Sequence, residues 1–298
     1  MVRDILNLEF YSGEDLYCDG EIEDELLEIV TTNKDYTEIL KRDNRWPILY
    51  HLSNIRENLF EWYEFKKSDS VLEIGSGCGA LTGMLCRKAG QVTCIELSKK
   101  RSLINASRNK SCDNLEIIVG NFQDIKIDRK FDYVTLIGVL EYAPSYMGTD
   151  EPFAAMLTKI RNFLRPGGKV IIAIENKFGL KYFAGATEDH TGNWFEGIES
   201  YKDEHGVRTF SKREIEKLLL ENRYINMEFY YPMPDYKMPT VVYSEEYLPQ
   251  KGDLRNISYA YDRARYELFD EEVVYDQLCD DKLFGYFSNS FLIFAQAE

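Results

Sequence analysis

Three glycines at alternate positions follow an apolar run of the kind that forms a buried strand. Residues 71–79 read VLEIGSGCG, which places Gly75, Gly77 and Gly79 directly after the run. Glycine costs backbone entropy and is used where the chain turns sharply or a ligand approaches the backbone. A second apolar run ends at Glu96, about 20 residues after Gly75, the spacing at which an acid binds a ribose. With Ala80 completing a GxGxxA pattern, the loop indicates a nucleotide site, and on these residues alone NAD is a viable cofactor.

Further features favour S-adenosylmethionine over NAD. Glu73 lies inside the first strand, where its charge would repel a pyrophosphate but attract a ligand that carries an ammonium and a sulfonium. After the third strand, Phe122 and Asp124 suit an adenine ring and its exocyclic amine. The last two predicted strands come as a pair after the final helix, which breaks the strand–helix alternation.

The elements that position these residues alternate between strand and helix from residue 70 onward. Continuous apolar strands of this kind are typical of a parallel sheet with helices on both faces. The strands are predicted at 70–75, 91–97, 115–120, 131–139 and within 164–176. A helix with Ser211 and Glu214 as a capping box follows, then strands at 225–234 and 288–296 and a helix near 271–278. Before residue 70 the pattern is helical, with Ile48, Leu52 and Ile55 on one predicted apolar face and the acids of 21–28 facing solvent.

Five motifs in order resemble those of class I S-adenosylmethionine-dependent methyltransferases. They are VLEIGSGCG, CIEL, NFQDI, FDYVTLIGVLEYA and LRPGGKVIIAIEN, and they span residues 70–176. The resemblance implies an α/β, Rossmann-like methyltransferase fold with a mostly parallel seven-stranded sheet and an antiparallel C-terminal hairpin. It also implies that residues 1–67 form a helical cap and 68–298 the methyltransferase domain, with an acceptor-loop region at 177–209 and an insertion at 235–287.

The same resemblance implies how the cofactor is held. The glycine loop would lie against the methionine moiety, Glu96 would bind both ribose hydroxyls, and backbone after the fourth strand would border the cofactor. Arg56, in a helix that also carries His51, is a candidate to pair with the cofactor carboxylate. The predicted cofactor-binding residues are Glu73, Gly75, Ser76, Gly77, Gly79, Glu96, Leu97, Phe122, Asp124, Gly138, Val139 and Arg56.

More loosely, the C-terminal half resembles bacterial methyltransferases associated with glycosyltransferases of surface-polysaccharide assembly. The segments that carry this resemblance are ENKFGLKYFAG, EDHTG and FYYPMPDYKMP. It implies a sugar hydroxyl as acceptor and a glycosyltransferase as pathway partner. The predicted function is methylation of a small molecule or saccharide, most simply at oxygen. A non-catalytic subunit that binds S-adenosylmethionine, and an NAD-dependent oxidoreductase, are the alternatives.

An alcohol acceptor must lose its proton during methyl transfer, so a base or a metal ion is needed. His190, in the long loop after the fifth strand, is the predicted base, with Glu175 as a second catalytic residue. The rival is Mg²⁺, because the resemblance implies that Glu141, Glu175 and Asn176 occupy places where metal-dependent relatives carry acidic and amide ligands. Oxygen ligands suit that ion, although no metal is predicted. The remaining loop histidine, His205, is predicted in a turn.

Composition limits the partners. The formal net charge is −15, so nucleic acids and anionic membrane surfaces are not expected to bind. Six cysteines without a CxxC pair argue against structural zinc, and Cys78 and Cys94 are predicted to be buried thiols. The N-terminus lacks the pattern of a signal peptide and no apolar run is long enough to span a membrane, so a cytoplasmic location is expected.

Overall fold

The computed structural model describes residues 5–15, 20–202, 206–257, 262 and 264–298. The chain divides into two compact units. The first unit comprises Met1–Ile137 and Ile160–Val170, and the second comprises Gly138–Lys159 and Ile171–Glu298. Helix α8 (Pro152–Phe163) and strand β6 (Leu164–Glu175) each contribute residues to both units.

The first unit contains parallel strands, as predicted. β2 (Ser70–Ile74) pairs with β3 (Gln91–Glu96) on one side and with β5 (Phe131–Ile137) on the other. β3 pairs in turn with β4 (Leu115–Val119), and the two-residue β1 (Leu6–Asn7) adds to β4. All five residues of β2 are buried, which is why its sequence is continuously apolar apart from Ser70 and Glu73.

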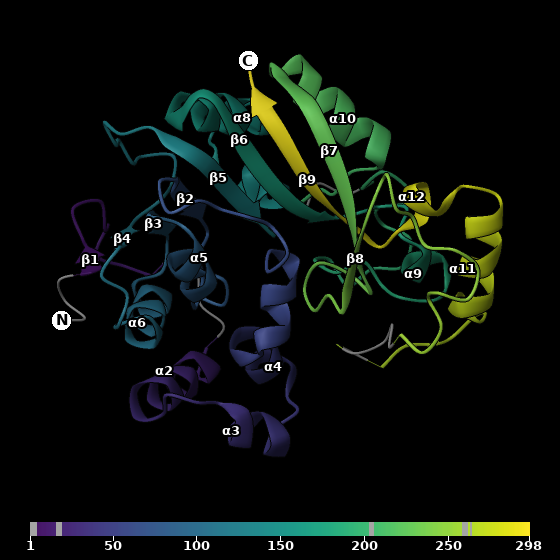
Figure 1. Ribbon diagram of the computed structural model, residues 1–298, viewed down its shortest axis with the longest axis horizontal. Helices are drawn as coiled ribbons and strands as arrows, with labels where there is room; N and C mark the ends of the chain where they lie inside the picture. The colour runs from purple at the N-terminus through teal and green to yellow at the C-terminus, as the bar shows by residue number, and fades with distance from the viewer. Residues whose placement is uncertain (1–4, 16–19, 203–205, 258–261, 263) are drawn as a thin grey trace. The chain divides into compact units, whose positions relative to one another are not determined.

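Helices surround these strands in the first unit. Ser98 caps α6 by accepting a hydrogen bond from the backbone N–H of Arg101, as expected for a serine before a helix. In Figure 1, α6 lies between α2 and the strands β3 and β4. The helices are α2 (Ile22–Thr32), α3 (Thr37–Arg42), α4 (Trp46–Leu52), α5 (Thr82–Lys88) and α6 (Lys99–Arg108), with the 3-10 helix η1 (Asn54–Leu59).

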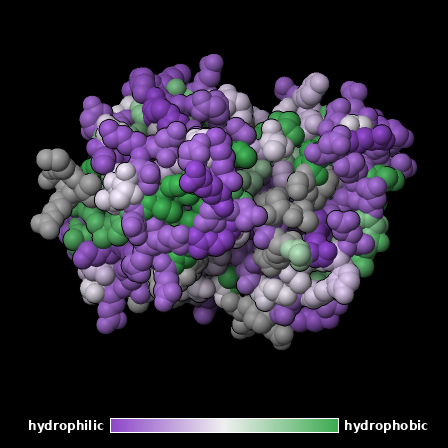
Figure 2. All heavy atoms as spheres, turned by 90° about the horizontal axis from the view of Figure 1, so that it is seen from below, coloured by the Kyte–Doolittle hydropathy of each residue, from purple (hydrophilic) through white to green (hydrophobic). Residues whose placement is uncertain are grey.

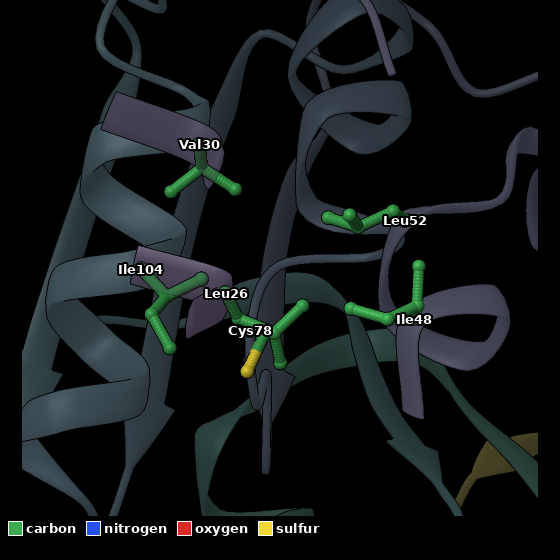
Figure 3. Packing of buried hydrophobic residues seen from close by; sticks show 6 residues of the cluster. All are labelled: Leu26, Val30, Ile48, Leu52, Cys78 and Ile104. Carbon is green, nitrogen blue, oxygen red and sulfur yellow. The ribbon is translucent and has the colours of Figure 1, made fainter. Parts of the chain in front are cut away.

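The N-terminal helices pack against the glycine loop through an apolar cluster (Figure 3). Cys78, the residue between Gly77 and Gly79, is a buried thiol inside this cluster, and Cys94 is buried too, as predicted. The loop is therefore supported from behind by residues more than 20 positions upstream. The cluster consists of Leu26, Val30, Ile48, Leu52, Cys78 and Ile104.

The prediction that Ile55 continues the apolar face of 46–59 is wrong, because its side chain is 42% exposed. The helix α4 ends at Leu52, and Ser53 is extended. The Ser53 side chain accepts a hydrogen bond from the backbone N–H of Ile55 and starts η1 in a new direction. Serine competes in this way with helix continuation, and the helical register is lost.

The second unit contains the antiparallel strands of the C-terminal half. β7 (Tyr224–Met233) pairs with β9 (Ser290–Ala297) on one side and with β8 (Val241–Ser244) on the other. Helix α10 starts at the predicted capping box, in which Ser211 and Glu214 exchange side-chain and backbone hydrogen bonds. The helices here are η2 (Leu140–Tyr142), α7 (Ala143–Tyr146), α9 (Leu180–Phe183), α10 (Lys212–Glu221), α11 (Glu271–Asp280) and α12 (Phe284–Phe287).

The strand number differs from the prediction of seven, because the residues that the structure describes form nine strands. The two additional strands are β1 and β8. β1 is only two residues long, which is too short for a periodic pattern to be recognised in the sequence. β8 lies in the segment 235–287 that was predicted as an insertion, and it extends the C-terminal hairpin to three antiparallel strands.

Figure 2 shows one face of the molecule, on which hydrophilic residues predominate and hydrophobic ones appear in smaller groups. In the part of the chain that the structure describes, no helix is both long enough and apolar enough to cross a bilayer.

Candidate functional site

The glycine loop after β2 has a backbone that side chains disfavour. Gly75, Gly77 and Gly79 have φ values of +68°, +52° and +75°. At Gly79 a Cβ atom would lie 2.3 Å from Oδ1 of Asn105 on α6, so glycine is required by packing as well as by conformation. At Gly77 a Cβ atom would meet no described atom within 4 Å. The loop therefore has room beside Gly77, where a ligand can approach the backbone.

Glu96 joins the end of β3 to this loop. Its Oε2 accepts a hydrogen bond of 2.8 Å from the backbone N–H of Gly77, and its Oε1 accepts one of 2.9 Å from Ser98. The carboxylate is buried, and burial raises the pKa of Glu96 against the effect of these hydrogen bonds. A carboxylate has about four acceptor positions, so two remain for ribose hydroxyls. Leu97, between Glu96 and Ser98 in the sequence, is half-buried.

Glu73 and Ser76 make their hydrogen bonds within the protein. Oε2 of Glu73 accepts hydrogen bonds from Thr82 Oγ1 at 2.6 Å and from Cys94 Sγ at 3.3 Å. Burial raises the pKa of Glu73 to about 7. Ser76 Oγ accepts a hydrogen bond from Nδ2 of Asn105 at 3.2 Å. These contacts fix the loop to α5 and α6, and a direct contact of Glu73 or Ser76 with the cofactor remains a prediction.

Arg56 is the clearest unsatisfied group of the first unit. It is 5% exposed, and its Nε and Nη1 atoms have no hydrogen-bond partner among the described residues. Its guanidinium stacks 3.8 Å above the ring centroid of Tyr50. Its charge also opposes the burial effect on the pKa of Glu73. Two buried guanidinium nitrogens without hydrogen bonds are costly, so an anionic partner is expected, and the carboxylate of S-adenosylmethionine has the right chemistry.

Phe122 and Asp124 lie in the turn after β4. Phe122 is buried, with its ring centroid 5.9 Å from that of Phe163. Asp124 is exposed, and its backbone N–H donates to the carbonyl of Asn121. An aromatic ring fixed by packing and an exposed acid two residues later agree with the predicted adenine contact without testing it.

Gly138 and Val139 begin the second unit directly after β5. Gly138 has φ of +68°, and a Cβ atom there would lie 2.8 Å from the hydroxyl of Tyr236. The Val139 carbonyl accepts a hydrogen bond from the N–H of Tyr142. Only glycine fits at position 138, so the chain turns sharply here into η2.

His51 is buried near three arginines of the first unit. Burial, followed by the charges of Arg101, Arg56 and Arg108, lowers the pKa of His51 to about 3. In the unfolded chain this histidine takes up a proton near pH 6.5, whereas the folded protein keeps it neutral. The folded state therefore loses stability as the pH falls from about 6.5 towards 3.

We expect the loss of unfolding free energy between pH 7 and pH 5 to be smaller in His51→Gln than in the wild type by about 2 kcal/mol. Urea unfolding at the two pH values measures it. Equal losses in both proteins would show that His51 does not carry this pH dependence.

In the second unit, Glu141, Glu175 and His190 come together. Glu141 lies in η2, Glu175 is the last residue of β6, and His190 belongs to the loop that follows α9. Nε2 of His190 is 3.7 Å from Oε1 of Glu141 and 3.9 Å from Oε2 of Glu175. The predicted base and the acids of the predicted rival mechanism therefore form one cluster.

Glu188 orients the imidazole of His190. Its Oε1 is 2.9 Å from Nδ1 of His190 and accepts a hydrogen bond from the hydroxyl of Tyr201. Its Oε2 accepts hydrogen bonds of 2.7 Å from the backbone N–H groups of His190 and Thr191. Nδ1 is therefore the donor to Glu188, and Nε2 faces Glu141 and Glu175. Glu188 was not among the predicted site residues, although a glutamate two residues before His190 is a visible signal for such a turn.

The charges around His190 determine its protonation. Burial would lower its pKa, but Glu175, Glu141 and Glu188 outweigh burial and raise it to about 11. Burial raises the pKa of Glu141, whereas Lys237 and His190 outweigh burial at Glu175 and lower its pKa. An imidazole that is already protonated cannot accept a proton, so this arrangement is poorly matched to the predicted role of His190 as a general base.

Two lysines complete the surroundings of Glu175. Nζ of Lys237 is 2.8 Å from Oε1 of Glu175 and 2.9 Å from Oδ1 of Asp189. Nζ of Lys181 is 2.7 Å from the other oxygen of Asp189. The Tyr236 hydroxyl donates a 3.2 Å hydrogen bond to Oε1 of Glu175. One oxygen of Glu175 is thus fixed, and the other is directed towards His190. His205, by contrast, lies outside the described residues.

Residues 72–170 match the family described as methyltransferase domain. An uncharacterized methyltransferase of Alkaliphilus oremlandii is 29% identical over 145 residues, which cover 49% of this chain and 59% of that protein. The mitochondrial ubiquinone biosynthesis O-methyltransferase of Dictyostelium discoideum is 30% identical over 128 residues, 39% of this chain and 38% of that protein. Ribosomal RNA small subunit methyltransferases are also among the relatives. The chain spans less than two thirds of the length of the two proteins compared.

Among solved structures, phosphoethanolamine N-methyltransferase 1 of Haemonchus contortus, in complex with phosphoethanolamine and S-adenosylhomocysteine, has a TM-score of 0.51. The sequences are 12% identical, and the match covers 93% of this chain and 48% of that chain. At this identity the likeness concerns the fold alone. The predicted Rossmann-like methyltransferase fold is confirmed, and residues 72–170 match the family described as methyltransferase domain.

Proposed function

We propose that this chain is an S-adenosylmethionine-dependent methyltransferase that acts on a hydroxyl group of a small molecule or saccharide. The main support for this cofactor is the hydrogen bond from the Gly77 N–H to the Glu96 carboxylate, next to the open space beside Gly77. The buried Nε and Nη1 atoms of Arg56, which have no hydrogen-bond partner among the described residues, support the same cofactor, because an anion such as the methionine carboxylate would satisfy them. The match of residues 72–170 to a methyltransferase domain favours this cofactor over NAD.

The cofactor, when bound, supplies a methyl group activated by a sulfonium. The chain's own residues bind and orient it: Glu96 accepts from the ribose hydroxyls, and Arg56 pairs with the carboxylate. Phe122 offers an aromatic face for adenine, and Gly77 offers backbone without a side chain. Much of the rate of such an in-line transfer comes from positioning, so a rigid glycine loop serves catalysis directly.

The acceptor class rests on the second unit. An alcohol must lose a proton during transfer, and a buried group of two carboxylates and an imidazole, Glu141, Glu175 and His190, supports an acceptor of that kind. Exposed Trp194 and Phe195 in the same loop provide faces on which a sugar ring can stack. We also propose an association with a glycosyltransferase pathway, and only the resemblance of the C-terminal half supports it. The net charge of −15 favours a small acceptor over a nucleic acid.

We expect S-adenosylhomocysteine to raise the melting temperature, because a ligand at 100 times its Kd stabilises the folded state by about 2.7 kcal/mol. NAD at the same concentration should leave it unchanged. Thermal unfolding followed by intrinsic fluorescence measures both. A shift with NAD alone would contradict the proposed cofactor. Release of S-adenosylhomocysteine from S-adenosylmethionine in a panel of nucleotide sugars then distinguishes an enzyme from a subunit that only binds.

A further inference from the structure

Among the carboxylate oxygens of the second unit that are buried without a hydrogen-bond partner among the described residues, three belong to one cluster of side chains. They are both oxygens of Glu141 and Oε2 of Glu175. Glu141 is 1% exposed and Glu175 is 0% exposed. A buried carboxylate without hydrogen bonds is costly unless a cation compensates for the lost water. All three atoms belong to the cluster that also contains His190.

The spacing of the cluster does not suit direct hydrogen bonds. The distances of 3.7 and 3.9 Å from Nε2 of His190 to the two carboxylates exceed hydrogen-bond length. Metal–ligand bonds of about 2.0–2.2 Å place two ligands of one ion roughly 3–4.3 Å apart. One ligand atom from each of Glu141, Glu175 and His190 lies within 4.8 Å of the others. The two distances from Nε2 of His190 to the carboxylates therefore fall within the spacing of ligands around a single ion.

Both flanking ligands are held from outside. Nδ1 of His190 is fixed by Glu188, the carboxylate–histidine arrangement that orients imidazole ligands at metal sites. Oε1 of Glu175 is fixed by Lys237 and Tyr236. Nε2 of His190 and Oε2 of Glu175 are the atoms that remain, and Nε2 lies between the two acids, 3.7 Å from Glu141 and 3.9 Å from Glu175.

The charges agree with a bound cation. Carboxylates outnumber lysines in this region, so a dication supplies positive charge that the protein lacks when the imidazole is neutral. The carboxylates are Glu141, Glu175, Glu188, Asp189 and Asp235, and the lysines are Lys181 and Lys237.

We propose that Glu141, Glu175 and His190 bind one divalent transition-metal ion. The imidazole beside two carboxylates favours Mn²⁺, Fe²⁺ or Zn²⁺ over the Mg²⁺ that oxygen ligands alone would suggest. Three protein ligands leave coordination positions for water or for acceptor oxygens. The suggestion that acceptor oxygens fill these positions rests on the proposed function, whereas binding of the ion does not.

The test uses the full-length protein after treatment with a chelator and dialysis. Mn²⁺ is titrated in, and the unbound ion is followed by electron paramagnetic resonance. The wild type should bind one Mn²⁺ per chain, and Glu141→Gln and His190→Asn should each weaken binding at least tenfold. Glu188→Gln, which changes a positioning residue, should weaken it about 10–100-fold. Glu196→Gln is the matched control, since Glu196 is a buried acid of the same loop outside the cluster, and it should bind as the wild type does.

A second probe keeps the test independent of any one variant. Co²⁺ bound by the wild type should give a visible absorption band, and His190→Asn should alter it because a nitrogen ligand is lost. Melting temperatures without metal show that each variant folds. No uptake of Mn²⁺ by the wild type at millimolar concentration, or uptake unaffected by Glu141→Gln and His190→Asn, overturns the metal site.

The two proposals fail separately. S-adenosylhomocysteine binding without metal binding overturns the metal site alone. Metal binding by the folded protein without any response to S-adenosylhomocysteine overturns the proposed function alone.

Discussion

His190→Ala is expected to lower the turnover of methyl transfer by roughly 10²–10⁴-fold. The imidazole faces Glu141 and Glu175 in a buried cluster, and its removal takes away one of the three proposed metal ligands. The affinity for S-adenosylhomocysteine should change little, because the residues assigned to the cofactor in the first unit are untouched. Steady-state formation of S-adenosylhomocysteine with a productive acceptor, combined with calorimetric titration, measures the two quantities.

The matched control for this variant is Glu196→Gln, which alters a buried acid of the same loop without touching the cluster. Excess Mn²⁺ should partly restore Glu188→Gln, which keeps all three proposed ligands, and should not restore His190→Ala. If His190→Ala turns over like the wild type, catalysis depends on positioning alone. The acceptor would then be an amine that arrives neutral rather than an alcohol.

Glu96→Ala is expected to weaken binding of S-adenosylhomocysteine by on the order of 2 kcal/mol or more, which is roughly thirtyfold. The change removes the acceptor for the ribose hydroxyls and also the hydrogen bonds that Glu96 accepts from Gly77 and Ser98. Calorimetric titration of the wild type and the variant gives the two dissociation constants.

Glu73→Gln is the control for Glu96→Ala. Glu73 is also a buried acid, in the neighbouring strand, but it accepts its hydrogen bonds from Thr82 and Cys94 behind the loop. Its replacement should affect binding less than Glu96→Ala does. Unfolding in the absence of ligand separates a loss of stability from a loss of affinity, and an unchanged dissociation constant in Glu96→Ala would rule out Glu96 as the ribose ligand.

The parallel strands were predictable because each is a short, continuously apolar run bounded by turn residues. β2 and β3 are the clearest cases, and the glycines after β2 and the acid at the end of β3 follow from the same pattern. The capping box of Ser211 and Glu214 was predictable as well, because all of its contacts lie within four residues of sequence. Interactions between residues that are close together in the sequence determine these features.

Burial decided by distant contacts was not predictable. Glu23 was expected on the solvent-facing side of α2, but it is fully buried, and its Oε1 is 2.7 Å from Nε of Arg101 on α6. The packing of α2 against α6 brings the two together, and no periodicity within either helix contains that information.

The same limit applies to the cluster in the second unit. The sequence identified Glu141, Glu175 and His190 separately and assigned them to rival mechanisms. Their union depends on how the long loop folds back onto the end of β6, and so does the contact of Lys237 with Glu175, which joins residues far apart in the chain. Only Glu188 left a local signal, through its position two residues before His190.

The burial of Cys78 among Leu26, Ile48 and their neighbours means that the conformation of the glycine loop depends in part on the N-terminal helices. The helices that support the loop precede it in the sequence. A variant that lacks these helices would therefore bind the cofactor more weakly. Its predicted nucleotide-binding residues would all still be present. The N-terminal helices thus support the conformation of the loop. Deleting them would lower the affinity for the cofactor without changing any proposed catalytic residue.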